Sequence, residues 1–312
     1  MLNSNFNHKS VMLNEVLENL DLKNKGVYID ATFGAGGYSK AILDANEKNQ
    51  VIAFDRDENV KELASSFKKR YQERFNFYNE CFSNIKNIKL RDDIAAIIFD
   101  LGVSSMQLDD ADRGFSFNKK AKLDMRMGKN SISAYEVVNQ FKEEDLANII
   151  YQYGDEKYSR IIAKNICKER AVKPIKFTTE LADIIAKAKN RYFSKTHPAT
   201  KSFQAIRIYV NQELEEIKNA LEATKKLLKK NGKLIIVSFH SLEDKIVKNF
   251  LKKHSKTENS NRYLPLNDIN KQEAIFKILI NGKKTSKDEI DSNIRARSAI
   301  LRAAVRLWKK LI

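Results

Sequence analysis

The chain is poor in cysteine, proline and glycine, and it has no long apolar run. Its 312 residues include two cysteines, three prolines and ten glycines. Cys81 and Cys167 stand far apart with no CxxC pair, which argues against a disulfide scaffold and against a zinc site. We therefore expect no metal. The first eight residues contain no apolar signal segment, and no run of about 18 apolar residues occurs, so we expect a cytoplasmic protein without a membrane partner.

Negative charge is also in short supply. The chain has 57 Lys and Arg against 40 Asp and Glu, a net charge of +17 and a sequence pI near 9.6. So basic a surface attracts polyanions, because each phosphate that it neutralises releases a counterion. This balance favours nucleic acid as the partner. Hydrophobic residues make up 42% of the chain, enough to bury a core. The oligomeric state stays open.

Short apolar runs alternate with helical patterns over the first hundred residues. We expect strands at residues 27–29, 51–54, 74–78 and 94–99, and helices at 10–20, 38–45 and 58–71. Near-continuous apolar strands suit a parallel sheet that is covered by helices on both faces. The alternation therefore predicts a doubly wound α/β sheet.

The rhythm changes in the middle of the chain and then returns. Residues 101–130 have few periodic apolar positions and predict a long loop, and helices are expected at 134–140, 143–153, 156–170 and 179–189. The simplest architecture is an α/β domain at 1–107 and 201–312, interrupted by a helical insertion at 108–200.

After the insertion, the pattern predicts one long helix at 203–230, a strand at 232–238 and a helix that opens with a capping box at Ser241. Residues 255–270 are polar and are expected to be mobile. A strand at 274–280 should close at Asn281-Gly282 and pair with a last strand at 298–307.

Acidic and glycine residues follow the predicted strands where these end. Asp30 ends the first strand and precedes a turn with Gly34, Gly36 and Gly37, which opens a helix. Asp55 ends the second strand, and its carboxylate can accept hydrogen bonds from ribose hydroxyls. Glycines and a helix N-terminus let backbone N–H groups approach a ligand closely.

Two further strand ends add an aromatic ring and a third carboxylate. Phe82 follows the third strand and could pack on an adenine face, and Asp100 ends the fourth strand. Ligands of open α/β sheets lie beyond the carboxyl ends of the strands, so these residues predict a nucleoside pocket. A nicotinamide dehydrogenase is the rival, but the turn is not G-x-G-x-x-G and nothing provides for a pyrophosphate.

Longer motifs carry a closer resemblance. Beyond the strand ends they include QLDD at residues 107–110, RGFSF at 113–117, LDMRM at 123–127, HPAT at 197–200, FQAIR at 203–207, VNQEL at 210–214, SFHSLED at 238–244 and RARS at 295–298. In these stretches, which cover nearly the whole chain in order, the sequence resembles the ribosomal RNA small subunit methyltransferase H family, also called the MraW family.

The resemblance implies a Rossmann-like class I methyltransferase fold and S-adenosylmethionine as methyl donor. It also implies N4-methylation of a cytidine in the decoding region of 16S ribosomal RNA, within the small subunit. The implied cofactor contacts are Gly34, Gly36, Gly37, Tyr38, Asp55, Phe82, Asp100 and Gln107. The family usually has histidine where this chain has Tyr38, so a backbone contact survives there and an imidazole role does not.

Methyl transfer needs an acceptor that orients the cytosine amine, and Asp100 is the candidate for this catalytic role. Substrate contacts are expected from the loop and the insertion, with His240 at a strand end as a further candidate that could equally cap a helix. The residues proposed for the substrate are Arg113, Arg126, Lys201, Arg207 and His240. An alternative is a catalytically inactive RNA-binding assembly factor on the same fold.

Overall fold

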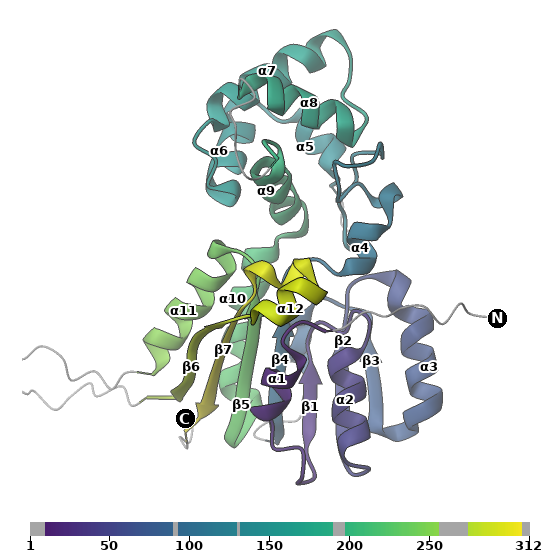
Figure 1. Cartoon of the computed structure of the whole chain (residues 1–312), viewed down its shortest axis with the longest axis vertical. Helices are drawn as coiled ribbons and strands as arrows, with labels where there is room; N and C mark the ends of the chain where they lie inside the picture. Colours follow the sequence, from purple (N-terminus) through teal and green to yellow (C-terminus); the bar gives the residue numbers. More distant parts are fainter. Residues whose placement is uncertain (1–9, 90–92, 130–131, 190–196, 256–273, 308–312) are drawn as a thin grey trace, which may run out of the picture. The chain divides into compact units, whose positions relative to one another are not determined.

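The chain divides into two compact units, and the first is built from both ends of the sequence (Figure 1). The computed structural model describes residues 10–89, 93–129, 132–189, 197–255 and 274–307. Unit 1 is Met1–Gly102 with Leu214–Ile312, and unit 2 is Val103–Glu213. The sequence placed these two boundaries after residues 107 and 200.

Unit 1 contains a seven-stranded sheet in the order β3-β2-β1-β4-β5-β7-β6. The strands are β1 (Val27–Asp30), β2 (Gln50–Phe54), β3 (Phe75–Tyr78), β4 (Ile94–Asp100), β5 (Leu228–Ser238), β6 (Phe276–Lys284) and β7 (Ile300–Arg306). The first five strands of that order pair in parallel, and β7 is antiparallel to both of its neighbours. The predicted doubly wound sheet and the pairing of the last two strands are confirmed.

Helices cover the sheet because its strands are apolar on both faces. The helices of unit 1 are α1 (Leu13–Glu18), α2 (Gly37–Ala45), α3 (Lys61–Tyr71), α10 (Glu213–Leu227), α11 (Ser241–His254) and α12 (Lys287–Ser292), with short 3-10 helices η1 (Glu58–Val60), η2 (Gln72–Arg74), η3 (Phe82–Asn87) and η5 (Ile294–Ser298). One core cluster joins Ile29, Phe99 and Ile236 of the sheet to Ile217 of α10 and Phe250 of α11. Burial of these side chains is what holds the sheet and its helices together.

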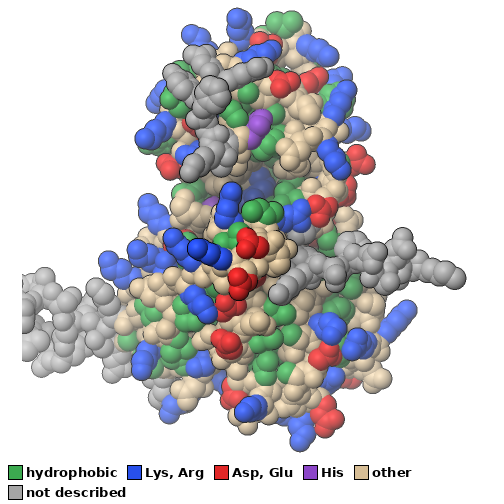
Figure 2. Space-filling model, viewed as in Figure 1, with side chains coloured by type: hydrophobic (Ala, Val, Ile, Leu, Met, Phe, Trp, Pro, Cys, Tyr) green, Lys and Arg blue, Asp and Glu red, His purple; other side chains and the backbone are tan. Residues whose placement is uncertain are grey.

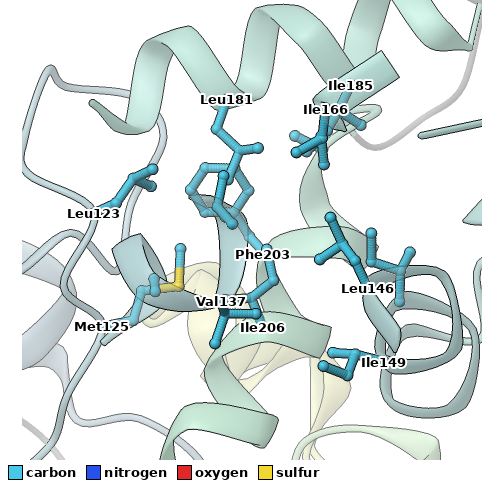
Figure 3. Packing of buried hydrophobic residues seen from close by; sticks show 14 of the residues in the cluster. Leu123, Met125, Val137, Leu146, Ile149, Ile166, Leu181, Ile185, Phe203 and Ile206 are labelled. Atoms are coloured by element: carbon cyan, nitrogen blue, oxygen red, sulfur yellow. The ribbon is translucent and has the colours of Figure 1, made fainter. Parts of the chain in front are cut away.

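Unit 2 is helical, as expected for residues 134–189. Its helices are α4 (Ser105–Asp109), α5 (Ala134–Gln140), α6 (Glu143–Gly154), α7 (Ser159–Val172), α8 (Thr178–Ala188) and α9 (Thr200–Asn211), with the 3-10 helix η4 (Ala111–Arg113). They enclose a core of their own, in which Val137, Leu146, Ile166, Leu181 and Ile206 are fully buried (Figure 3). The predicted loop at 101–130 was wrong in part, since α4 and η4 lie within it.

The single long helix predicted at 203–230 was also wrong. The chain breaks at Gln212, whose φ of 52° is left-handed, so that α9 and α10 are separate helices. The reason is a long-range contact. The buried Asn211 side chain accepts the N–H of Met127 (2.8 Å) and donates to the carbonyl of Met125 (2.7 Å), which fixes the end of α9.

Two smaller predictions fail at element ends. The strand expected to close at Asn281-Gly282 continues to Lys284, with a register irregularity at this point. The capping box of α11 starts one residue earlier than predicted, with His240 in place of Ser241 as the N-cap. Residues 255–270 were expected to be mobile, and of these 256–270 lie outside the described residues. None of the described helices has the length and apolar character that crossing a membrane requires.

Candidate functional site

The glycine turn after β1 forms the floor of the site in unit 1. Gly36, with φ of 75°, is the N-cap of α2, so the turn leads directly into the helix N-terminus. The N–H of Gly34 donates to Oδ2 of Asp55 (2.8 Å), which ties the turn to the end of β2. A Cβ on Gly34 would meet only the carbonyl oxygen of Thr32, at 3.8 Å. The turn therefore has open space above it.

The N-terminal segment packs against this turn from its other side. A Cβ on Gly37 would lie 1.9 Å from Oγ of Ser10, so only glycine fits there without movement of its neighbour. Tyr38, 3% exposed, donates its hydroxyl to the carbonyl of Val11. Burial raises the pKa of Tyr38 well above its ordinary value, so this phenol stays protonated as a donor. The side chain of Tyr38 thus makes a structural contact within the protein, and a cofactor contact through its backbone stays a prediction.

Asp55 presents a partly buried carboxylate at the end of β2. Its Oδ2 accepts the N–H of Gly34, and its Oδ1 accepts the N–H of Asp57 (2.9 Å). Each oxygen keeps one further lone pair, enough for the two hydroxyls of a ribose. Asn79, after β3, donates to the backbone carbonyls of Asp55 (2.8 Å) and Asp57 (3.2 Å) and holds this loop. Burial raises the pKa of Asp55 to about 6.

Asp30, fully buried at the end of β1, has a different part. Its carboxylate accepts the hydroxyl of Ser39 (2.6 Å) and the N–H of Thr32 (3.3 Å). Burial raises its pKa to about 6, although both hydrogen bonds oppose the rise. The hydroxyl of Thr32 in turn accepts the N–H of Asp100 (2.7 Å). Asp30 therefore braces the turn and connects it to the end of β4.

Asp100 contributes a buried side-chain oxygen at the end of β4. Its Oδ1 is buried, and no hydrogen-bond partner for it occurs in the described part of the chain. Burial raises the pKa of this carboxyl well above its ordinary range, and the negative charges of Asp30, Glu243 and Glu289 raise it further. A buried acceptor without a donor is costly, so it points to a ligand that would supply one.

Phe82 and His240 complete the strand ends of unit 1. Phe82 is half-buried in η3, and its ring meets that of Phe99 edge-on, with centroids 5.7 Å apart. His240 follows β5, where its Nδ1 accepts the N–H of Glu243 (3.4 Å). The Glu243 carboxylate, fully buried, accepts the N–H groups of Phe239 (2.8 Å) and His240 (3.3 Å). His240 thus caps α11, and its predicted contact with substrate stays a prediction.

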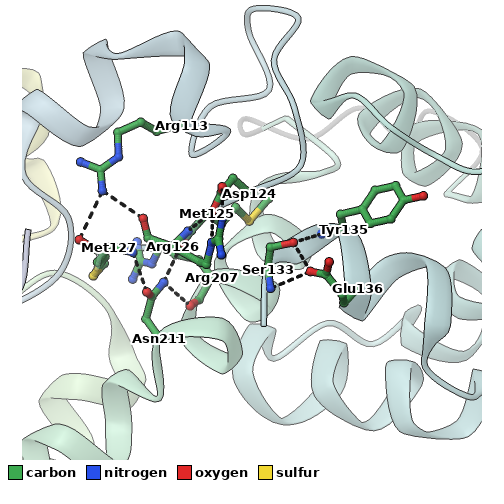
Figure 4. A network of polar contacts seen from close by, with 10 residues as sticks. All are labelled: Arg113, Asp124, Met125, Arg126, Met127, Ser133, Tyr135, Glu136, Arg207 and Asn211. Carbon is green, nitrogen blue, oxygen red and sulfur yellow. Dashed lines mark hydrogen bonds and ion pairs between the residues drawn. The ribbon is translucent and has the colours of Figure 1, made fainter. Parts of the chain in front are cut away.

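The predicted substrate arginines form polar contacts within unit 2 (Figure 4). Arg207 binds Glu213 through two nitrogen–oxygen contacts of 2.8 Å, with the arginine side chain 14% exposed. Arg126 also forms a bidentate ion pair, in which its Nε and Nη2 donate to the two carboxylate oxygens of Asp124 at 2.7 and 2.8 Å. Arg113 donates to the carbonyl of Arg126 at 2.9 Å. These contacts give all three arginines a structural part, and their binding of RNA stays a prediction.

Lys201 and Gln107 also belong to unit 2. Nζ of Lys201 donates to the carbonyl of Asp155 (2.8 Å) from an exposed position. Oε1 of Gln107 accepts the N–H of Ser104 (3.0 Å), and Oγ of Ser104 accepts the N–H of Gln107 (3.2 Å). This capping box opens α4, and Gln107 is 5% exposed. Its predicted contact with the cofactor stays a prediction too.

Sequence reasoning assigned no role to several residues of the site. Ser10, Val11 and Asn79 shape the turn and the loop around Asp55, and no local pattern indicates these contacts. Glu289 of α12 accepts the N–H of Met12 (2.6 Å) across 277 positions of sequence. Pairing over such a separation leaves no periodic signal in either segment.

The residues of unit 1 suit a small nucleoside cofactor. An open glycine turn, a carboxylate with free lone pairs and a partly buried aromatic ring lie at the ends of adjacent parallel strands. The buried Oδ1 of Asp100 could accept a hydrogen bond from a ligand or lie close to a positive charge on it. Together with the strand order, these features define an α/β methyltransferase, and the predicted fold class is confirmed.

Comparison with known proteins gives the family. A model of the MraW methylase family matches residues 5–307, so the chain belongs to that family. A ribosomal RNA small subunit methyltransferase H of Rickettsia bellii is 47% identical over 306 residues, covering 96% of this chain and 99% of the relative. Its namesake in Ruthia magnifica is 47% identical over 304 residues, covering 95% and 97%. S-adenosylmethionine, the predicted cofactor, is the methyl donor.

Solved structures resemble the chain only distantly. An rRNA methylase from Streptococcus thermophilus has a TM-score of 0.38 at 13% identity, over 95% of this chain and 94% of that one. An S-adenosylmethionine-dependent O-methyltransferase from Thermotoga maritima has a TM-score of 0.43 at 9% identity, over 99% and 71%. At these scores the likeness carries no weight for the activity.

Proposed function

We propose that this enzyme methylates N4 of a cytidine in the decoding region of 16S ribosomal RNA, within the small ribosomal subunit. Relatives that share about half of its residues over nearly their whole length are named ribosomal RNA small subunit methyltransferase H. The net charge of +17 suits a substrate made of phosphates.

One observation carries the catalytic part of this proposal. The Asp100 carboxylate ends β4 with a buried oxygen that has no partner in the described part of the chain, and the N–H of Asp100 binds the hydroxyl of Thr32 in the glycine turn. A cytosine amine is a weak nucleophile, since its lone pair is delocalised into the ring. An acceptor that binds one of its N–H groups orients the amine and increases its reactivity.

S-adenosylmethionine supplies an electrophilic methyl group on a positively charged sulfur. In this arrangement Asp55 binds the ribose hydroxyls, Phe82 lies against the adenine, and Asp100 accepts a hydrogen bond from the base. Burial raises the pKa of Asp100, and a positive charge close to it would lower that pKa and so favour the ionised carboxylate, which is the better acceptor.

We further propose that unit 2, Val103–Glu213, contributes to recognition of the RNA. A base inside a helix is out of reach of any pocket, so the target cytidine has to be splayed out or already unpaired. Among the candidates in unit 2, Lys201 and Arg126 are exposed enough to meet phosphates, whereas Arg207 is nearly covered by its partner.

The test is transfer of labelled methyl groups to small subunits that lack the mark. Subunits from cells without this gene are incubated with the enzyme and S-adenosylmethionine, and methylated cytidines of 16S RNA are mapped. We expect one N4-methylcytidine in the decoding region. Asp100→Asn, which keeps the shape of the side chain but removes its charge, should lower the rate at least about a hundredfold, as expected when a charged, oriented acceptor is lost. The rate is measured at a saturating concentration of S-adenosylmethionine, because Asp100 is also a predicted cofactor contact.

The outcomes separate the alternatives. Methylation at a different base or RNA would reject the substrate. Binding of subunits without any transfer would favour the assembly-factor alternative. Calorimetry with NAD in place of S-adenosylmethionine tests the dehydrogenase alternative, and tight NAD binding would overturn the pocket assignment.

A further inference from the structure

The segment before β7 lies at the same edge of the sheet as the site. Ile300, the first residue of β7, pairs with Ser238 at the carboxyl end of β5, and Asp100 pairs with Val237 one position earlier. The chain therefore enters the sheet at the edge where Asp100 ends its strand. The entering segment consists of α12 and η5, separated by one residue.

Internal contacts anchor this segment to the body of unit 1. Glu289 of α12 accepts the N–H of Met12, the residue after Val11, which accepts the hydroxyl of Tyr38, and the charge of Glu289 acts on Asp100. In η5 the middle residue, Ala296, is fully buried, and its carbonyl accepts the hydroxyl of Thr285 (2.8 Å). A 3-10 helix fixed at its middle residue holds its other side chains in defined outward positions.

Those outward side chains combine positive charge with an apolar group. Ile294 is 67% exposed, and Arg295, Arg297 and Ser298 are also exposed, with no acidic residue in η5. Lys284, which pairs with Ile300 in the sheet, adds another exposed cation at this edge. Figure 2 shows Lys and Arg side chains on the face where α12 lies in Figure 1, with acidic side chains beside them.

We propose that η5 binds single-stranded ribosomal RNA next to the target base, with Arg295 and Arg297 on phosphates and Ile294 against a neighbouring base. This inference rests on the proposed function and names the part of unit 1 that holds the substrate. Guanidinium groups bind phosphate oxygens in pairs and stack on bases, and unpaired bases offer apolar faces. One exposed isoleucine followed by two exposed arginines in a short 3-10 helix fits RNA better than a protein surface.

The test compares two doubly substituted enzymes that lose the same charge. One is Arg295→Gln with Arg297→Gln, and the control is Lys25→Gln with Lys48→Gln, exposed positions just before β1 and β2 at the opposite edge of the sheet. Equilibrium binding to unmethylated small subunits is measured over a series of salt concentrations, together with calorimetry for S-adenosylmethionine and thermal unfolding.

We expect the arginine variant to bind subunits about tenfold more weakly, with a slope of log affinity against log salt that is shallower by about 1.4 for two lost single-strand phosphate contacts. The control should change the affinity less than threefold. Both should bind the cofactor as the unchanged enzyme does. Ile294→Ser should weaken binding with no change of the salt slope.

Equal effects of the two double variants, or an unchanged salt slope in the arginine variant, would overturn the inference. If the arginine variant sedimented differently from the unchanged enzyme but bound RNA with the same affinity, the inference would be overturned as well, because η5 would then contact protein. Failure of the unchanged enzyme to bind or methylate small subunits rejects the proposed function itself, so the two failures are distinguishable.

Discussion

Replacement of Asp55 by asparagine tests the cofactor pocket most directly. Asparagine keeps the shape of the side chain but puts an NH2 group in place of one acceptor oxygen and removes the charge. The carboxylate accepts the N–H of Gly34 at 2.8 Å and that of Asp57 at 2.9 Å, so one of these donors would face another donor. The side-chain oxygen that remains for the ribose hydroxyls no longer belongs to a charged carboxylate, so it is a weaker acceptor.

The size of the effect follows from those bonds. Hydrogen bonds to a charged acceptor contribute about 1.5–3 kcal/mol, which corresponds to a cofactor Kd about 10 to 150 times higher. The unpaired N–H group also costs folding stability, about 1–3 kcal/mol. A loosened loop would by itself weaken binding, so a control is required.

Asn79→Ala is that control, because Asn79 holds the same loop and we assign it no contact with the cofactor. It removes donors to the carbonyls of Asp55 and Asp57, at 2.8 and 3.2 Å. Calorimetry with S-adenosylmethionine, at a temperature where both variants are folded, should give a Kd within about threefold of the unchanged enzyme for Asn79→Ala. A Kd for Asp55→Asn within twofold, or equal losses in both variants, would refute the reasoning.

Three further predictions concern the frame of the site. Gly37→Ala should lower the free energy of unfolding by about 1–3 kcal/mol, and adding Ser10→Gly should restore most of it in urea titrations. A carboxyl whose folded pKa is raised to about 6 stabilises the fold below pH 4 and loses that contribution as the pH rises through 6. The free energy of unfolding of the unchanged enzyme should therefore fall by about 2 kcal/mol between pH 4 and pH 7 because of Asp30, and this part of the fall should be absent in Asp30→Asn. Gln212→Gly should raise the free energy of unfolding by about 0.5–1 kcal/mol, and a loss would contradict left-handed strain there.

Local pattern predicted the frame of unit 1 well. Each parallel strand is a short apolar run that ends at a carboxylate or a polar loop, and the sheet brings Asp30, Asp55 and Asp100 to adjacent strand ends. What the pattern could not give was the division of labour among them. Asp30 braces the turn through Ser39, whereas Asp100 keeps a buried oxygen without a partner in the described residues.

The failures have a common physical cause in long-range contacts. Glutamine is a good helix former, so nothing local predicts a break at Gln212; the break follows from the bonds of Asn211 to Met125 and Met127. Arginines chosen for RNA by charge alone turned out to have carboxylate and carbonyl partners close by in unit 2. Charge counts predict the polarity of a surface, but only the fold shows which cations a neighbour already binds.

The order of strands in the sheet has a consequence for biosynthesis. Strand β4 emerges from the ribosome more than a hundred residues ahead of β5, its neighbour, while unit 2 is a continuous piece with its own core. Unit 2 can fold early, but one edge of β4 stays unpaired until the C-terminal strands have been synthesised. Slow synthesis past residue 213 should therefore prolong a partly folded, aggregation-prone state, and binding of chaperones during translation should be greatest there.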